Sequence, residues 1–237
     1  MSITIDLIGV NELADPGLWL AAQSAIARQN PAAVRLELRG SSNFLFTDRT
    51  SGVYETLCDL AKRLDREQQK TPVPKTARKK PAKKAATKKT KMKSRFPHLL
   101  AVFTPETIFE PPGIFVPIDF DEPVTVEIPP PPGVPRGKEP LPTVTVGSSP
   151  RLLEELALLA KTQALPAGVI ELAERAHEAL AVDADADERV ELSDVESIMK
   201  AVDTDGTATD ARGRWGIFVL TLFARNALAR TLIISFD

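Results

Sequence analysis

The sequence contains very few of the residues that build disulfides, histidine metal sites and aromatic cores. A single cysteine, Cys58, excludes a disulfide framework, and two histidines argue against a metal site built from histidine. Aromatic residues make up only 5% of the chain, so we expect an aliphatic core. Cys58 falls within the apolar spacing of a predicted helix and is expected to be a buried or half-buried thiol.

The sequence also lacks the patterns of secreted and membrane-spanning chains. Residues 1–6 show no basic region followed by an apolar core, so no secretory signal is predicted. The most apolar stretch, 216–224, is nine residues long, whereas a membrane-spanning helix needs ~20. These absences predict a cytoplasmic protein without a membrane partner.

Motifs for cofactors and catalysis are missing as well. No glycine-rich nucleotide motif and no Gly-x-Ser-x-Gly elbow occurs, so no cofactor and no catalytic residue is predicted. His98 and His177 are the candidate bases, but neither has a recognisable setting beside a nucleophile. The acidic pairs Glu154/Glu155 and Asp119/Asp121 are interpreted as ordinary surface or strand-end residues. We therefore expect a protein that is not an enzyme.

The charge is distributed very unevenly, although the formal net charge is only −2. Between Lys70 and Arg95 there are 12 Lys and Arg residues and no acidic residue, which leaves a balance of −14 for the remainder. Like charges repel, and this stretch has few side chains that could form a core. Residues 69–96 are therefore predicted to be a disordered lysine-rich linker.

This run has two competing interpretations: a solvated linker without a partner, or a segment that binds a polyanion such as nucleic acid or an acidic protein surface. Lysines near phosphates release condensed counterions, so such binding would not depend on sequence and would weaken steeply with salt. In composition the run resembles the tails of linker histones and lysine-rich bacterial proteins. An acidic surface of the same protein could also hold it. The candidate contacts are Lys79, Lys80, Lys83, Lys84, Lys88, Lys89, Lys91 and Lys93.

An acidic stretch further along resembles the calcium loop of an EF-hand. Asp183, Asp185 and Asp187 fall at loop positions one, three and five, and Asp194 at position twelve. The sixth position, normally glycine, is Glu188, and the twelfth is shorter than the usual glutamate. Residues 193–196 also fit a helix capping box. The alternative is a solvated connection between two helices.

Hydrophobic periodicity predicts a β-α-β-β-α unit in residues 1–68. Strands are expected at about 3–10, 34–39 and 44–46, and helices from Asp15-Pro16 to Asn30-Pro31 and over 51–68. Residues 97–237 are predicted to hold strands first and helices afterwards. The strands are expected at 99–103, 114–120, 124–128 and 142–146, around a proline-rich loop at 129–142. The helices are expected from Ser149, around 169–180, from Ser193 and over 211–230, before a final strand at 231–236.

The predicted fold class is α+β, with a mixed or antiparallel sheet, packed helices, a helix-rich C-terminal part and a long disordered basic insertion. The 1–68 unit is expected to pack against 97–237. For function we expect a non-catalytic interaction or regulatory protein, similar in character to inhibitors and immunity proteins, whose partner is another protein. The alternatives are an accessory protein that binds nucleic acid or another polyanion through 70–95, independently of sequence, and a calcium-modulated protein.

Overall fold

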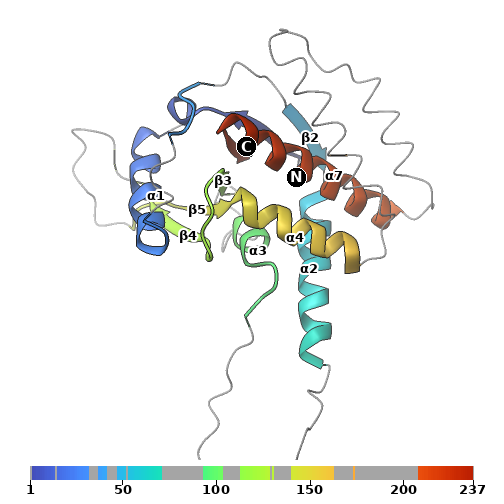
Figure 1. The fold of residues 1–237 in the computed structure, drawn as a ribbon. Coiled ribbons are helices and arrows are strands. Elements are labelled where there is room, and N and C mark those ends of the chain that lie inside the picture. The colour runs from blue at the N-terminus through green and yellow to red at the C-terminus, as the bar shows by residue number, and fades with distance from the viewer. Residues whose placement is uncertain are drawn as a thin grey trace, which may run out of the picture.

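The computed structural model describes residues 2–13, 15–31, 37–41, 47–51, 53–70, 93–103, 113–128, 130, 140–162, 173 and 208–236. In these ranges the chain forms an α+β fold, which confirms the predicted class (Figure 1). Its strands are β1 (Ser2–Ile8), β2 (Thr47–Ser51), β3 (Ile114–Val116), β4 (Val124–Glu127), β5 (Thr143–Ser148) and β6 (Ile233–Phe236). Its helices are the short 3-10 turn η1 (Val10–Glu12), α1 (Pro16–Gln29), α2 (Val53–Lys70), α3 (Pro97–Phe103), α4 (Ser149–Thr162) and α7 (Ala208–Arg230).

The strands form one mixed sheet in the order β2-β1-β6-β3-β5-β4. Among the described strands, only the β3–β5 pair is parallel, and the other four pairs are antiparallel. The sheet is joined at its middle by β6: Ile234 lies opposite Leu7 of β1 on one side and opposite Phe115 of β3 on the other. The N-terminal strands and the strands after residue 113 therefore belong to the same sheet.

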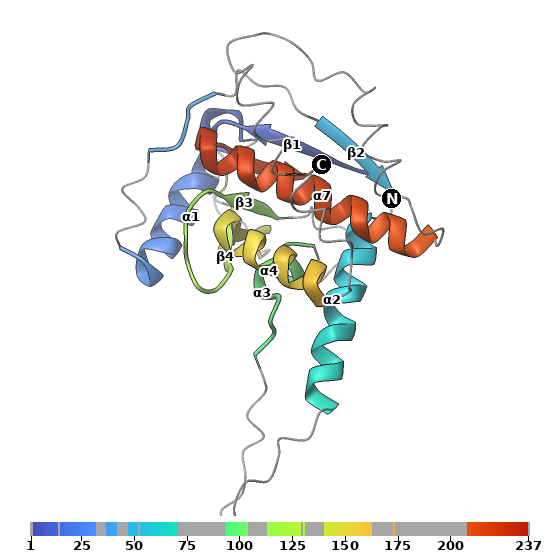
Figure 2. The ribbon, with the colours of Figure 1, turned by 45° about the vertical axis from the view of Figure 1, so that its right-hand side comes forward.

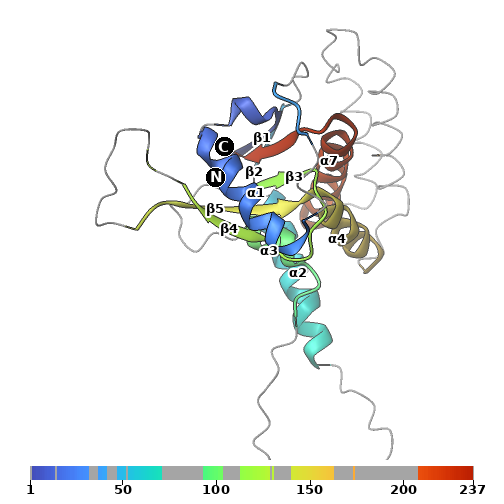
Figure 3. The ribbon, with the colours of Figure 1, turned by 60° about the vertical axis from the view of Figure 1, so that its left-hand side comes forward.

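Both faces of this sheet are covered by helices. Helix α1 buries Leu18, Ala22 and Ile26 against one face, together with Val116 and Val146. Helices α2, α3, α4 and α7 lie on the other face (Figure 3). The three residues of β3 are all buried because their side chains alternate between these two cores.

Helix α7 is the most buried helix of the described chain and lies beside α4 and α2 (Figure 2). A Cβ atom at Gly216 would lie 2.6 Å from Val53 Cγ1 and 2.7 Å from Leu57 Cδ1. Glycine at this position is what allows α2 to approach α7 so closely. After Arg230 the chain turns through Thr231, whose φ of 55° is left-handed, and Leu232 N donates to Ala227 O at 3.0 Å.

The predicted helix start at Asp15-Pro16 is confirmed. Pro16 occupies the first turn of α1, and Asp15 Oδ1 accepts a hydrogen bond from Gly17 N at 2.7 Å. The prediction for Cys58 is also confirmed, because the side chain is buried on α2 and burial raises the pKa of its thiol to about 12.

The strand predicted at 99–103 is wrong, because these residues belong to helix α3. Five consecutive apolar residues fit a buried helix as well as a strand, and the short run could not separate the two. The strand predicted at 34–39 is not formed at residues 37–39, where single hydrogen bonds join Arg39 O to Val10 N and Arg39 N to Thr231 O. Residues 34–36, the strand at 44–46 and the helices predicted between 163 and 207 lie outside the described residues.

The predicted linker, 69–96, overlaps the described chain at both of its ends. Helix α2 continues to Lys70, and Phe96 is fully buried in the core shared with α4 and α7. Within the described ranges, no helix has the length and apolar character needed to cross a membrane.

Candidate functional site

A group of polar side chains gathers where α3 meets α4 and the loop between β3 and β4. The chain enters α3 through Ser94 and Arg95, and both residues are fixed on α2. Ser94 Oγ donates to Asp65 Oδ2, and Arg95 N donates to Asp65 Oδ1 at 3.2 Å. The Arg95 guanidinium lies against α2 as well, because its Nη2 donates to Leu64 O at 3.1 Å.

Arg151, in the first turn of α4, holds three carboxylates together. Its Nε lies 2.8 Å from Asp119 Oδ1, its Nη2 lies 3.1 Å from Asp121 Oδ1, and its Nη1 lies 3.1 Å from Glu154 Oε2. The three acids are 55%, 84% and 69% exposed, so they remain open to a partner. We call Asp119, Asp121, Arg151 and Glu154 the carboxylate cluster; its formal charge is negative because three acids surround one base.

His98 fixes the loop that carries two of these acids. Its Nδ1 accepts a hydrogen bond from Ser148 N at 3.1 Å, so in the neutral ring the proton is on Nε2, which lies 3.3 Å from Asp121 O. Burial lowers the pKa of His98 and favours this neutral form. The histidine therefore positions Asp121 relative to β5 and α4.

Glu155 lies one residue beyond Glu154 but points in the other direction, into the protein. Its Oε1 accepts from His98 N at 2.9 Å and its Oε2 accepts from Leu99 N at 2.8 Å, so a side chain of α4 caps the first turn of α3. The residue is only 5% exposed, and this burial raises the pKa of Glu155 to about 7. The described side chains form no ion pair with it.

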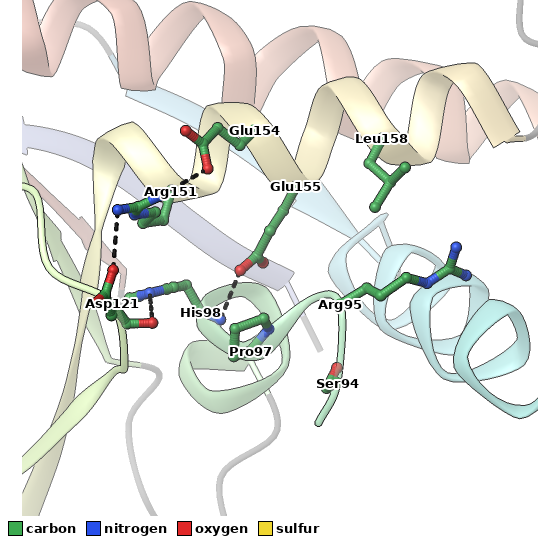
Figure 4. Close-up of a pocket in the computed structure, with 9 residues that line it drawn as sticks. All are labelled: Ser94, Arg95, Pro97, His98, Asp121, Arg151, Glu154, Glu155 and Leu158. Atoms are coloured by element: carbon green, nitrogen blue, oxygen red, sulfur yellow. Dashed lines mark hydrogen bonds and ion pairs between the residues drawn. The ribbon is translucent and has the colours of Figure 1, made fainter. Parts of the chain in front are cut away.

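A cavity of about 310 Å³ lies between these groups (Figure 4). In this view Glu155 and His98 lie between two groups of lining residues, Asp121, Arg151 and Glu154 on one side and Ser94 and Arg95 on the other; Pro97 and Leu158 supply apolar walls. The cavity thus combines a buried carboxylate, an exposed acidic margin and two apolar surfaces. Within the described part of the chain, no cluster of His, Cys, Asp and Glu side chains is arranged to hold a metal ion.

Most of the site residues predicted from sequence fall outside the described ranges. The structure does not describe the four residues of the predicted calcium loop, Asp183, Asp185, Asp187 and Asp194. It also does not describe seven of the eight candidate lysines, Lys79, Lys80, Lys83, Lys84, Lys88, Lys89 and Lys91. The eighth, Lys93, forms an ion pair with Glu122, which raises the pKa of the lysine and lowers that of the acid. These predictions therefore remain predictions.

The structure brings together residues that the sequence analysis placed on separate elements. The pairs Asp119/Asp121 and Glu154/Glu155 meet through Arg151 and His98, which no spacing in the sequence indicates. One signal was present: Glu155 falls on the apolar stripe of α4, beside Leu152, Leu156 and Leu159. A carboxylate among buried leucines indicates a buried acid with specific hydrogen-bond donors.

Comparison with known proteins assigns the chain to a family. A family model described as "Putative DNA-mimic protein" matches residues 20–236, and the chain belongs to this family. Among the curated proteins and the solved structures that were compared, none matches the chain.

Proposed function

We propose that the protein is a non-catalytic inhibitor that binds a DNA-binding protein by presenting carboxylates where DNA would present phosphates. The observation that carries the proposal is the family match over residues 20–236. A DNA-binding surface is lined with Arg and Lys side chains placed to contact phosphate oxygens. A mimic needs exposed carboxylates in fixed positions, because a fixed acceptor loses less conformational entropy on binding.

The carboxylate cluster supports this proposal and suggests where the surface lies. Arg151 restrains three exposed acids that would otherwise move freely, and His98 fixes the backbone at Asp121. A carboxylate can accept two parallel hydrogen bonds from a guanidinium, as a phosphate does. A fourth exposed acid, Glu122, lies on the same loop and forms an ion pair with Lys93.

The test is displacement of a labelled 20-base-pair duplex from purified sequence-independent DNA-binding proteins, followed by fluorescence anisotropy. We expect the protein to release the duplex, and to do so less well as salt rises, because ion pairing drives both complexes. The triple variant Asp119→Asn, Asp121→Asn, Glu154→Gln should weaken displacement by at least tenfold.

A matched control changes the same number of charges elsewhere. The variant Glu55→Gln, Asp59→Asn, Glu67→Gln removes three exposed acids of α2 and should displace the duplex within about threefold of wild type. Equal losses in both variants would mean that net charge alone acts. Direct binding of the duplex by the protein would favour the alternative in which the lysine-rich run contacts nucleic acid.

A further inference from the structure

The cavity beside the carboxylate cluster has the features of a pocket for a single cationic side chain. We propose that it receives an arginine of the DNA-binding partner, with the guanidinium directed at Glu155 and held at the margin by Glu154 and Asp121. This inference deepens the proposed function and rests on it for the identity of the partner. It names the contact at which the interface would be most sensitive to a single substitution.

The first argument is the state of Glu155. It is the buried carboxylate of the cavity, and its two oxygens are held by the backbone N–H groups of His98 and Leu99. Each carboxylate oxygen can accept more than one hydrogen bond, so acceptor capacity remains. A buried carboxylate without a cation is unfavourable, and an incoming cation relieves that cost.

The second argument is the balance of charge around the cavity. The two guanidiniums that line it are already engaged: Arg151 pairs with Asp119, Asp121 and Glu154, whereas Arg95 is directed toward α2 and pairs with Asp65. Figure 4 shows the two arginine side chains pointing away from each other. Among the described residues, the two guanidiniums, their ion-pair partners and Glu155 together make two cations and five carboxylates.

The third argument concerns the shape and the walls. A volume of about 310 Å³ accommodates a long side chain. Pro97 and Leu158 provide apolar surface for its methylene groups, as long cationic side chains prefer. We assign arginine rather than lysine because the acids lie in different directions, which suits a planar group with five donors, and because guanidinium is the more weakly hydrated cation.

Pairing with an arginine also makes binding depend on pH. A guanidinium keeps its charge at all accessible pH values, whereas Glu155, with a pKa of about 7, must lose its proton to pair with one. The charged or titratable groups around it are Asp65 on α2, Arg95 before α3, His98 on α3, Asp119 and Asp121 on the β3–β4 loop, and Arg151 and Glu154 on α4. Burial lowers the pKa of His98, so the two groups can be told apart in a titration.

The test uses the full-length ¹⁵N-labelled protein and three small probes, the Nα-acetyl amides of arginine, lysine and citrulline. Citrulline has the shape of arginine without its charge. We expect the arginine probe to shift the backbone amide signals of His98 and Leu99 saturably, at millimolar concentration. The lysine probe should bind more weakly, and citrulline should not bind.

Variants identify the group responsible. Glu155→Gln should abolish the arginine-dependent shifts, while Glu55→Gln, an exposed acid of α2 outside the cavity, should leave them unchanged. If Glu155→Gln does not fold, Leu158→Trp fills the cavity without altering the carboxylate and should also abolish binding. Wild-type affinity for arginine should fall roughly 30-fold between pH 8 and pH 5.5, with a midpoint at Glu155 and not at the His98 ring signals recorded in the same samples.

The outcomes separate this inference from the proposed function. Absence of saturable shifts, equal binding of citrulline or lysine, or unchanged binding in Glu155→Gln would overturn the arginine pocket. In the duplex-displacement assay, Glu155→Gln should lose at least tenfold if the pocket holds a partner arginine. If Glu155→Gln displaces the duplex as well as the wild type does, the arginine pocket is contradicted and the proposed function is not. If arginine binds but the wild type displaces no duplex, only the DNA-mimic proposal is contradicted.

Discussion

Glu155 shows how one side chain can serve the fold and still retain capacity for binding. A carboxylate that is 5% exposed would be unfavourable in the core without hydrogen-bond donors, and the first turn of α3 supplies two. Burial nevertheless keeps the pKa of the acid near 7, far above its ordinary value of 4.5. The folded state therefore holds the proton more tightly than the unfolded chain does.

This difference predicts how stability depends on pH. Between pH 4.5 and pH 7 the folded state binds more protons at Glu155 than the unfolded state, so the free energy of unfolding should decrease as pH rises through this range. The contribution is of the order of 3 kcal/mol and is complete below the unfolded pKa. Urea denaturation at pH 5 and pH 7.5 measures it. Glu155→Gln, which cannot titrate, should lose this part of the dependence, and an unchanged slope would contradict the assignment.

At the scale of single residues, the sequence showed which polar side chains are present but not which of them come together in space. The acidic pairs at 119/121 and 154/155 were visible in the sequence, and so was His98, but their convergence was not. Arg151 joins residues about 30 positions apart, and nothing in local spacing encodes such a contact. Burial of Cys58 was predictable because it depends only on the apolar stripe of one helix.

The contact between α2 and α7 is set by a glycine. Gly216→Ala would place a methyl group within 2.7 Å of Val53 and Leu57 side-chain atoms, so these side chains or the helices themselves must shift. We expect a loss of about 1–3 kcal/mol, reduced by the helix propensity that alanine adds. Chemical denaturation measures the change in the free energy of unfolding.

Gly213→Ala provides the matched control on the same helix. The nearest atom to a Cβ at this position is Thr56 Cγ2, at 4.0 Å, which is ordinary contact. Alanine should therefore be neutral or stabilise the protein by up to about 1 kcal/mol. A similar loss at both positions would show that the close approach of α2 is not the cause.

Element prediction succeeded where capping or periodicity gave a local signal. Asp15-Pro16 marks the start of α1, and strands β1, β3, β4, β5 and β6 all fall within or beside the predicted runs. It failed at α3 because the first turn of that helix is stabilised by Glu155, a residue 57 positions from His98. A seven-residue helix is too short to form without such a tertiary contact.

Strand β6 connects the two sides of the sheet, because it lies between β1 and β3 at the centre. Ile234 is fully buried in the larger core and lies opposite residues of both neighbouring strands. The two sides of the sheet should therefore unfold together in one transition.

Ile234→Ala tests this cooperativity. The substitution should cost about 2–5 kcal/mol and should reduce hydrogen-exchange protection equally in β1 and in β5. Thr125→Ala, at an exposed position of β4, should change neither value beyond about 0.5 kcal/mol. Loss of protection confined to β1 would mean that the two sides of the sheet are independent units.

The position of β6 also has a consequence during synthesis. Every other described strand precedes β6 in the chain. The edges of β1 and β3 that pair with β6 therefore stay unpaired until residues 233–236 have been synthesised. Open strand edges can pair with other chains, and contacts as distant as Ile5 with Phe236 form slowly. The incomplete sheet is therefore open to aggregation during synthesis. We expect a lower growth temperature or additional chaperone to increase the yield of native protein.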